Sequence, residues 1–126
     1  FLVFEIYKIL TLSSNDINYS NYPKALTDIL HYINQNYHEP LSLSLLSEKF
    51  AFSESYIARL FRTQLNTTVS NYINDIRLEH ASNYINNTIL SIAEIAELCG
   101  YNDIAYFSRK YKNKYGESPK SSRNRL

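Results

Sequence analysis

Two arginines, Arg59 and Arg109, occupy the same position in two copies of an internal repeat. The copies read LSLLSEKFAFSESYIARLFR (residues 43–62) and IAEIAELCGYNDIAYFSRKYK (residues 92–112). An isolated arginine is usually a solvated surface residue, but recurrence at one repeat position favours a shared role. Arginine can donate two hydrogen bonds to O6 and N7 of guanine, which discriminates between bases by about 1–3 kcal/mol. The repeat therefore predicts two side chains that read DNA bases.

Each copy predicts a short helix, a tight turn and a second helix, which is the helix-turn-helix arrangement. The first helices align at an offset of 49 residues and the second helices at an offset of 50, so the second copy has one extra residue at its turn. Small residues, Ser47 and Ala96, stand where the two helices must cross closely. Gly100 suits a left-handed turn, whereas the aligned Ala51 predicts a turn that is strained or differently shaped.

The second helix of each copy combines a buried apolar face with a polar face at helical spacing. The predicted inner residues are Ile57, Leu60, Phe61 and Leu65 in the first copy, and Phe107, Tyr111 and Tyr115 in the second. The candidates for reading bases on the polar face are Ser55, Ala58, Arg59, Ala105 and Arg109, and the family resemblance given below adds Ile104. The small ones let a helix enter the major groove and contact thymine methyl groups.

Cationic and hydroxyl side chains beside these positions are candidates for contacts with DNA phosphates, which position a protein without reading sequence. They are Arg62, Thr63, Ser108, Lys110, Lys112 and Lys114. The hydroxyl groups of Tyr56 and Tyr106 are further candidates for phosphate contact.

The elements that position these residues are also predicted to be helices. Apolar residues at intervals of three and four predict a helix from Pro23 to before Pro40, and a linker helix over residues 69–85. The linker would measure about 25 Å at 1.5 Å per residue. Successive major grooves on one face of DNA lie about 34 Å apart. With the width of the flanking helices added, the linker could place two recognition helices in adjacent grooves.

Capping residues predict where these helices begin and end. The predicted starts are Ser42 or its neighbours, Ser53, Ser91 with Glu94, and Asn102 or Asp103; the predicted ends are Asn66, Gly100, and Gly116 with Pro119.

Charge is unevenly distributed along the 126 residues, although the formal net charge is only +1. Residues 104–126 contain seven cations and one anion, a charge of +6, so the preceding 103 residues carry −5. A basic segment of this kind suits a polyanionic partner, although a solvated tail fits the same count.

Composition excludes several other classes of protein. Only two Gly and three Pro disfavour a turn-rich β-fold, and one Cys excludes a disulfide framework. No run approaches about 18 apolar residues, so we expect no membrane span. The sequence has no paired-carboxylate signature, glycine-rich phosphate loop or shared histidine spacing, so we expect no enzyme site, cofactor or metal.

Residues 1–22 differ in composition from the remainder. Residues 1–12 are mainly apolar and are expected to be the last helix of a missing upstream domain, while residues 13–22 are polar and predict a linker. A signal peptide is the alternative, but a basic start and a small-residue cleavage site are lacking. The DNA-binding domain is expected over residues 23–126, with helix-turn-helix units at 43–64 and 92–113.

The segment GYNDIAYFSRKYKNKYGESP (residues 100–119) resembles the AraC/XylS family of transcriptional regulators. Upstream residues extend the resemblance over about residues 25–123; they are Ser53, Tyr56, Arg59, Leu60, Phe61, Tyr72, Ile73, Arg77, Leu78 and Ala81. The resemblance implies an all-α fold of two homeodomain-like helix-turn-helix units joined by a linker helix. The chain departs from the family pattern at Ser47, Ala51, Asn66 and Ser122, which affects the first unit and the docking of the tail.

The resemblance also implies a function. It implies sequence-specific binding to double-stranded promoter DNA, usually with activation through contacts with RNA polymerase, in a cytoplasmic, nucleoid-associated protein. A separate regulatory domain upstream could form a homodimer. Two alternatives stay open: a DNA-targeting module of a larger enzyme such as a DNA-repair protein, and a helical protein-interaction module whose basic end meets an acidic partner.

Overall fold

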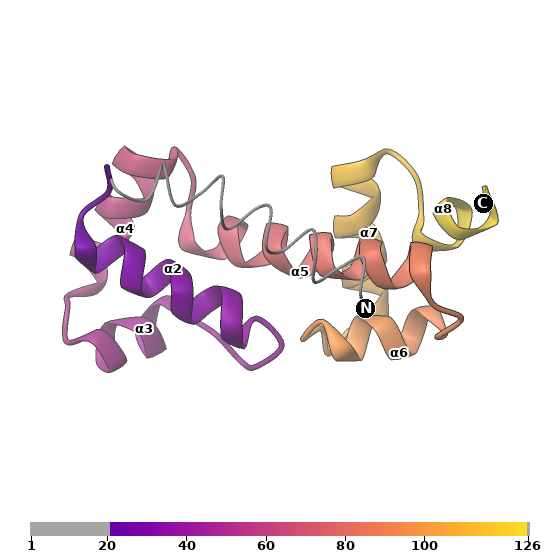
Figure 1. Cartoon of the computed structure of the whole chain (residues 1–126), viewed down its shortest axis with the longest axis horizontal. Coiled ribbons are helices and arrows are strands. Elements are labelled where there is room, and N and C mark those ends of the chain that lie inside the picture. The colour runs from indigo at the N-terminus through magenta and orange to yellow at the C-terminus, as the bar shows by residue number, and fades with distance from the viewer. Residues whose placement is uncertain (1–20, 126) are drawn as a thin grey trace. The chain divides into compact units, whose positions relative to one another are not determined.

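A computed structural model describes residues 21–125, and this range is all-helical, which confirms the predicted fold class (Figure 1). Its elements are α2 (Lys24–Asn36), α3 (Leu43–Phe50), α4 (Glu54–Leu60), the π-helical turn η1 (Phe61–Leu65), α5 (Val69–Asn87), α6 (Ile92–Leu98), α7 (Ile104–Tyr115) and α8 (Pro119–Asn124). The expectations for an upstream helix and most of the linker fall on residues 1–20, which lie outside the described residues. Among the described helices, none has both the length and the apolar composition that crossing a bilayer requires.

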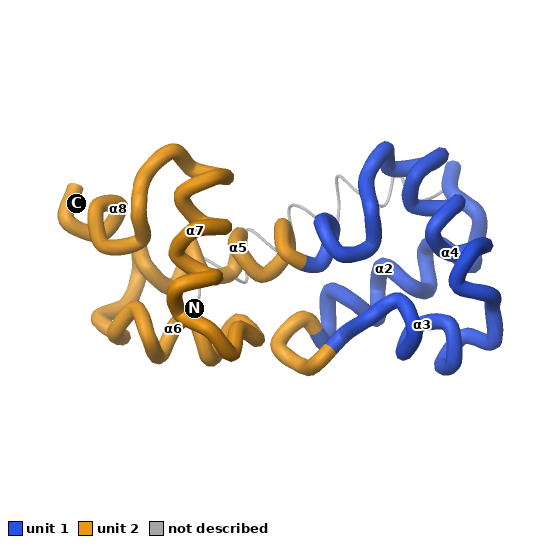
Figure 2. The backbone as a smooth tube through the Cα atoms, turned by 180° about the vertical axis from the view of Figure 1, so that it is seen from behind, with its two compact units in different colours: residues 1–36, 41–73 blue, residues 37–40, 74–126 orange. Residues whose placement is uncertain are grey.

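The described chain divides into two compact units (Figure 2). Unit 1 comprises residues 21–36 and 41–73, and unit 2 comprises residues 37–40 and 74–125. The boundary within α5 falls after Ile73, so one continuous helix contributes to both units. Residues 37–40, in the loop between α2 and α3, belong to unit 2, although the helices on either side of this loop belong to unit 1.

The core of unit 1 forms where the apolar face of α2 meets the helix-turn-helix. Leu26, Ile29 and Ile33 on α2 are fully buried, as their spacing predicts. The facing core residues are Leu46 from α3, Ile57, Leu60 and Phe61 from α4 and η1, and Val69 and Ile73 from α5. The apolar face of α4 is therefore inside, which leaves its opposite face outside.

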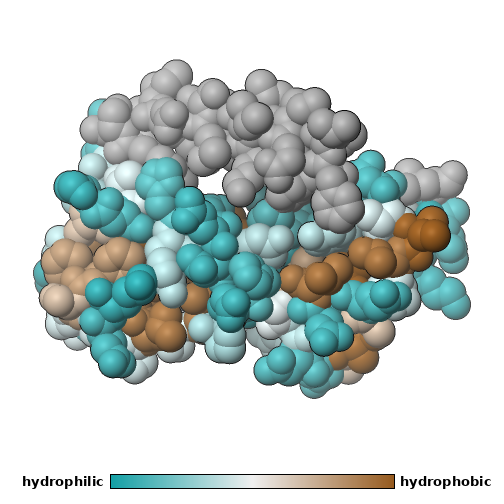
Figure 3. Space-filling view, turned by 60° about the horizontal axis from the view of Figure 1, so that its bottom comes forward, coloured by the Kyte–Doolittle hydropathy of each residue, from teal (hydrophilic) through white to brown (hydrophobic). Residues whose placement is uncertain are grey.

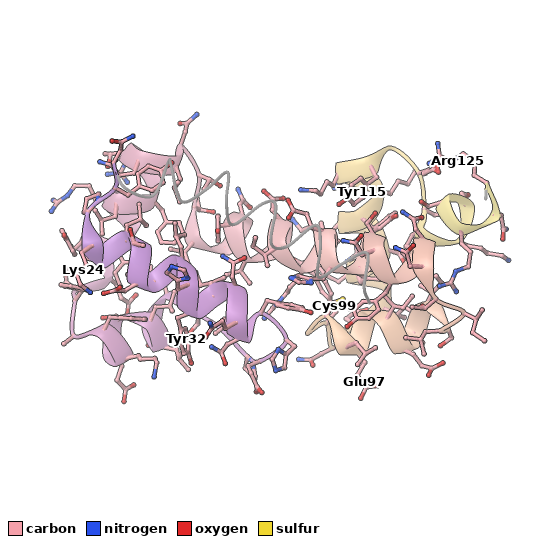
Figure 4. All side chains as sticks on the ribbon, viewed as in Figure 1. Lys24, Tyr32, Glu97, Cys99, Tyr115 and Arg125 are labelled. Atoms are coloured by element: carbon pink, nitrogen blue, oxygen red, sulfur yellow. The ribbon has the colours of Figure 1, made fainter. Side chains whose placement is uncertain are left out.

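The core of unit 2 has the same plan. It contains Leu78, Ala81 and Ile85 from α5, Ile95, Ala96 and Cys99 from α6 and its end, Tyr101 from the turn, and Phe107 and Tyr111 from α7. Tyr115 does not join this core: its side chain is 38% exposed at the C-terminal end of α7, so its predicted inner position is wrong (Figure 4). Tyr115 is the last residue of α7, and its ring lies against that of Tyr111 with centroids 4.7 Å apart.

Predicted caps fix the starts of the two helices that carry the candidate site. Ser53 Oγ accepts a 3.1 Å hydrogen bond from Tyr56 N at the start of α4. Asp103 Oδ1 accepts hydrogen bonds from Ala105 N (2.9 Å) and Tyr106 N (3.3 Å) at the start of α7. Ser91 and Glu94 form a capping box at the start of α6. These caps determine the residue at which each recognition helix begins.

The two helix-turn-helix turns have the same backbone plan despite their different residues. Ala51 and Gly100 both have positive φ, 58° and 95°. In both turns an amide donates across the turn to the first helix, from Phe52 N to Ser47 O (3.2 Å) and from Tyr101 N to Ala96 O (2.9 Å). The first turn gains a further bond from Ser47 Oγ to Phe52 O (2.5 Å), which the aligned Ala96 cannot make. The strain expected at Ala51 is present, and Ser47 supports the turn that carries it.

Two elements differ from the sequence-based expectations. The first recognition helix was expected to continue as an α-helix to Leu65, but α4 ends at Leu60 and the chain continues as η1 before Asn66 ends it with φ 54°. Pro119 was expected to terminate α7, but it begins the further helix α8 behind the cap Ser118. Proline fits this first helical position because its missing N–H is not needed there.

The surface has polar side chains between its apolar ones, as the face in Figure 3 shows. The large apolar side chains that are exposed within residues 21–125 include Leu45, Leu98 and Ile104, and Ile89 in the loop before α6 is fully exposed.

Candidate nucleic-acid interface

Arg59 and Arg109 lie on the outer faces of α4 and α7, and both side chains are exposed. Within residues 21–125, neither guanidinium donates a hydrogen bond or joins an ion pair. Each instead lies near the ring of the tyrosine three residues earlier, with Cζ 5.8 Å from the Tyr56 centroid and 6.0 Å from the Tyr106 centroid. Both arginines therefore keep their hydrogen-bond donors available for an external acceptor.

Two other arginines have the opposite environment. Arg77 donates from Nε to Tyr37 O (2.7 Å) and from Nη2 to Glu39 O (2.9 Å). Arg123 donates to backbone carbonyls of Ile85, Thr88 and Leu90. Burial lowers the pKa of Arg77, and nearby Tyr101 acts in the opposite direction. Arg77 and Arg123 are thus structural, which sets them apart from the two arginines of the repeat.

The other base-reading candidates surround these arginines on the same helices. Ser55 and Ala105 are exposed, each one residue into its helix, and Ala58 is half-buried next to Arg59. Ile104 is the first residue of α7, and its side chain is 47% exposed. An exposed isoleucine at the start of a recognition helix offers an apolar surface, which suits a base edge that carries a methyl group.

The phosphate candidates differ in how far the protein already uses them. Arg62 and Lys112 are exposed, and no ion pair engages either within the described range. Thr63 is exposed, but its hydroxyl donates to Arg59 O at 2.8 Å. Lys110 and Ser108 are half-buried, and Lys110 Nζ lies 5.5 Å from the Tyr106 ring centroid.

Lys114 is the phosphate candidate with an acidic partner inside the protein. Its Nζ lies 3.4 Å from Asp75 Oδ1 on α5. Burial raises the pKa of nearby Glu79, and the positive charge of Lys114 partly opposes this effect. Lys114 therefore neutralises acidic groups on α5, which reduces the charge it can offer outside.

A family model described as a helix-turn-helix domain matches residues 46–125, which include both arginine-bearing helices. The chain belongs to the AraC-type helix-turn-helix family. The family and its members among the relatives are DNA-binding transcriptional regulators and not enzymes.

Individual relatives of this AraC-type chain agree with the assignment. The transcriptional activator RhaS of Mannheimia succiniciproducens is 31% identical over 86% of this chain and 41% of its own length. The chain spans less than half of the length of the first curated relatives it matches. The C-terminal domain of AraT, a response regulator from Geobacillus stearothermophilus, is 28% identical with a TM-score of 0.81, over 84% of this chain and 88% of that domain.

A third relative was solved with DNA. The DNA-binding domain of AdpA, a global transcriptional factor in complex with a target DNA, has a TM-score of 0.76 over 79% of this chain and 90% of that one. Its identity to the AraC-type chain is 19%, so it shows the shared fold alone.

Arg123 is one of the seven cations in residues 104–126, and the structure shows that its guanidinium is bonded within the protein. Its guanidinium reaches three carbonyls at the end of α5 and in the following loop, about 35 residues away in sequence. No local pattern marks such a contact, because it depends on how α8 docks. The hydrogen-bond donors of Arg123 are therefore used inside the AraC-type domain, so fewer cationic side chains of this segment are available to bind phosphates than the sequence count indicates.

No group of three or more His, Cys, Asp or Glu side chains comes together as a metal site in the range that the structure describes. The lone cysteine, Cys99, is fully buried in the core of unit 2.

Proposed function

We propose that this chain is the sequence-specific DNA-binding domain of a transcription regulator, extending over residues 23–126, and that it binds double-stranded promoter DNA. The observation that carries this proposal is the pair Arg59 and Arg109: two exposed guanidinium groups at one repeat position, left unsatisfied by the protein. An unpaired guanidinium can form the bidentate contact with guanine. Membership of the AraC-type helix-turn-helix family supports the same function.

We further propose that the two recognition helices, α4 and α7, read adjacent major grooves. Support comes from α5, which is a single helix of 19 residues. Its length is about 28 Å at 1.5 Å per residue, close to the repeat of about 34 Å between grooves once the flanking helices are added. The proposed base-reading residues are Ser55, Ala58, Arg59, Ile104, Ala105 and Arg109.

The proposal for the whole protein goes beyond this domain. The name of the RhaS relative supports a role as an activator. Activation would act through contacts with RNA polymerase, in the cytoplasm and at the nucleoid, and the whole protein would form a homodimer through a domain outside this chain.

The experiment selects bound duplexes from a random pool with the wild-type chain and with Arg59→Ala and Arg109→Ala. Each variant should lose base preference at a different position of the site, by about 1–3 kcal/mol. Arg125→Ala is the control, because Arg125 is an exposed arginine outside both recognition helices (Figure 4). If the wild type and both variants select the same site with equal preference, the arginines do not read bases.

A salt titration on random duplex DNA separates DNA binding from a protein-interaction role. A DNA-binding domain releases counterions, so its affinity should fall linearly with salt on a logarithmic plot. A module that binds only an acidic protein would show no such slope on DNA.

A further inference from the structure

Each unit contains two aromatic rings and one arginine in contact at aligned repeat positions, and we call each set of three side chains a ladder. The first ladder consists of Phe52, Tyr56 and Arg59, and the second of Tyr101, Tyr106 and Arg109. Ring centroids lie 5.1 Å apart in Phe52–Tyr56 and 6.1 Å apart in Tyr101–Tyr106. The arginine Cζ then lies 5.8 Å and 6.0 Å from the tyrosine ring centroid. The two ladders have the same geometry, although Phe52 and Tyr101 align at an offset of 49 residues and the other two pairs align at an offset of 50.

The protein core holds the end of each ladder that lies farthest from the arginine. Phe52 is half-buried against the core of unit 1. Tyr101 is 7% exposed, and its hydroxyl donates a 2.9 Å hydrogen bond to Asn74 Oδ1 on α5. Tyr106 is 37% exposed, so the ladder runs from the core to the surface of α7. The exposed arginine is thus joined to a rigid element by an aromatic ring.

We propose that Tyr56 and Tyr106 are positioning residues that hold the guanidinium groups of Arg59 and Arg109 ready for guanine. This inference rests on the proposed function. Arginine and tyrosine three residues apart share one face of a helix, and a guanidinium is attracted to an aromatic face. The attraction limits the rotamers of a long, flexible side chain before DNA arrives, which lowers the entropy lost on binding. It also fixes the plane of the donor fork, on which bidentate contact depends.

The second ladder carries an additional cation. Lys110 Nζ lies 5.5 Å from the same Tyr106 ring, whereas the aligned residue of the first copy is the buried Leu60. Loss of the Tyr106 ring would therefore release two cations, and only one of them is a base-reading candidate. The experiment must separate their effects.

The experiment replaces each tyrosine by leucine, which removes the ring, and by phenylalanine, which keeps the ring without its hydroxyl. The measured quantity is the ratio of affinities for the selected duplex and for a duplex changed at the guanine that the arginine reads. Tyr106→Leu should reduce this ratio by about 3- to 10-fold, and Tyr106→Phe should leave it within about twofold. The same results are expected for Tyr56→Leu and Tyr56→Phe at the guanine assigned to Arg59.

Repeating Tyr106→Leu in an Arg109→Ala background shows whether the ring acts through the arginine. The ratio should then show no further change, since coupled residues are not additive. Lys110→Ala, which leaves Arg109 on the ring, should lower affinity for both duplexes alike. Tyr115→Leu removes an exposed tyrosine from the same helix without touching the ladder, and should leave the ratio unchanged.

Three results would overturn the inference. Equal losses in the leucine and phenylalanine variants would assign the effect to the hydroxyl and a phosphate. A loss that persists in the Arg109→Ala background would mean that the ring contacts DNA itself. If the leucine variants leave the affinity ratio unchanged while Arg109→Ala still reduces it, the proposed function stands but the tyrosine rings do not position the arginines. If Arg109→Ala itself has no effect on the ratio, the proposed function fails.

A measurement on the free wild-type chain keeps the inference testable even if a leucine variant does not fold. Nuclear magnetic resonance relaxation of the arginine Nε–H groups reports their motion directly. Arg59 and Arg109 should be more ordered than Arg62, which is exposed on η1 and has no ring beneath it within the described residues. Equal order in all three side chains would refute the positioning role without any reference to DNA.

Discussion

The hydroxyl of Tyr111 donates a 3.0 Å hydrogen bond to Oγ of Ser122, and both side chains are buried. Tyr111 lies on the inner face of α7 and Ser122 on α8, so the bond connects the second recognition helix to the C-terminal helix. Ser122 is a point at which the chain departs from its family pattern. Despite this departure α8 stays attached to α7, because the Ser122 hydroxyl accepts a hydrogen bond from the phenol of Tyr111.

Tyr111→Phe should therefore destabilise the chain. The variant keeps the ring in the core but leaves the Ser122 hydroxyl buried without this partner, at a cost of about 1–2 kcal/mol. Urea unfolding followed by circular dichroism measures the change. Tyr115→Phe is the matched control, since Tyr115 is 38% exposed and its change should be within about 0.5 kcal/mol. Equal stability of the two variants would show that the buried bond contributes nothing.

Arg123→Ala should be more costly than the loss of a surface charge. It removes the donors for Ile85 O (3.2 Å) and Thr88 O (3.3 Å) and for Leu90 O, which join α8 to the end of α5. We expect about 2–4 kcal/mol of lost stability in thermal or urea unfolding. Arg125→Ala removes a side chain that is 73% exposed and its 3.4 Å ion pair with Glu117, and should change stability by less than about 1 kcal/mol. The expectation fails if both variants unfold at the same midpoint.

Ala51→Gly should stabilise unit 1, against the usual direction of an alanine-to-glycine change. Ala51 has φ 58°, where an L-residue is strained and glycine is not. We expect the melting temperature to rise by about 3–5 °C. Gly100→Ala should lower it, because the added Cβ would lie 2.9 Å from Tyr37 O and 3.0 Å from Arg77 Nε. A drop in melting temperature for Ala51→Gly would show that the positive φ carries no strain.

Cys99 should resist thiol reagents in the folded chain. Burial raises the pKa of its thiol to about 12 from an ordinary value of 9.0, although the charge of Arg77 acts in the opposite direction. At pH 8 iodoacetamide should label the unfolded chain and spare the folded one. The raised pKa means that the unfolded chain loses this proton first, so stability should fall as pH rises from about 9 to 12. Labelling at equal rates with and without urea would contradict the burial.

Lys112→Ala and Lys114→Ala should affect DNA binding unequally. Lys112 is exposed, whereas Lys114 Nζ lies 3.4 Å from Asp75. Lys112→Ala should lower affinity on all sequences and reduce the slope of affinity against salt by about 1. Lys114→Ala should reduce the slope by less. Fluorescence anisotropy at several salt concentrations measures both, and a larger effect for Lys114 would reverse the assignment.

Features controlled by short-range chemistry could be predicted from the sequence. Ser53, Ser91 and Asp103 begin their helices as expected, because a cap depends on a side chain and an amide two or three residues away. The positive φ of Asn66 could also be predicted, because asparagine tolerates the left-handed conformation that ends a helix. The exposure of Arg59 and Arg109 followed from helical spacing, since residues opposite a buried face must face outward.

Features that depend on distant contacts could not be predicted. The π-helical turn at Phe61–Leu65 keeps the same apolar spacing of four that an α-helix would show, so periodicity does not reveal it. The role of Arg123 requires the carbonyls at the end of α5, and the ladder of Tyr106 requires Tyr101 to fold back from the turn. In each case the residue type is visible in the sequence, but its partner is set by tertiary packing.

The assignment of residues 37–40 to unit 2 has a consequence for dissecting the chain. No single cut yields both halves intact: a fragment that ends at Ile73 keeps Tyr37 without the ring of His80 that stacks on it at 3.7 Å. A fragment that begins at Asn74 keeps Arg77 without its carbonyl acceptors on Tyr37 and Glu39. Each piece expressed alone would thus be a damaged version of its half, and weak DNA binding by either would be no measure of what that half contributes in the intact chain.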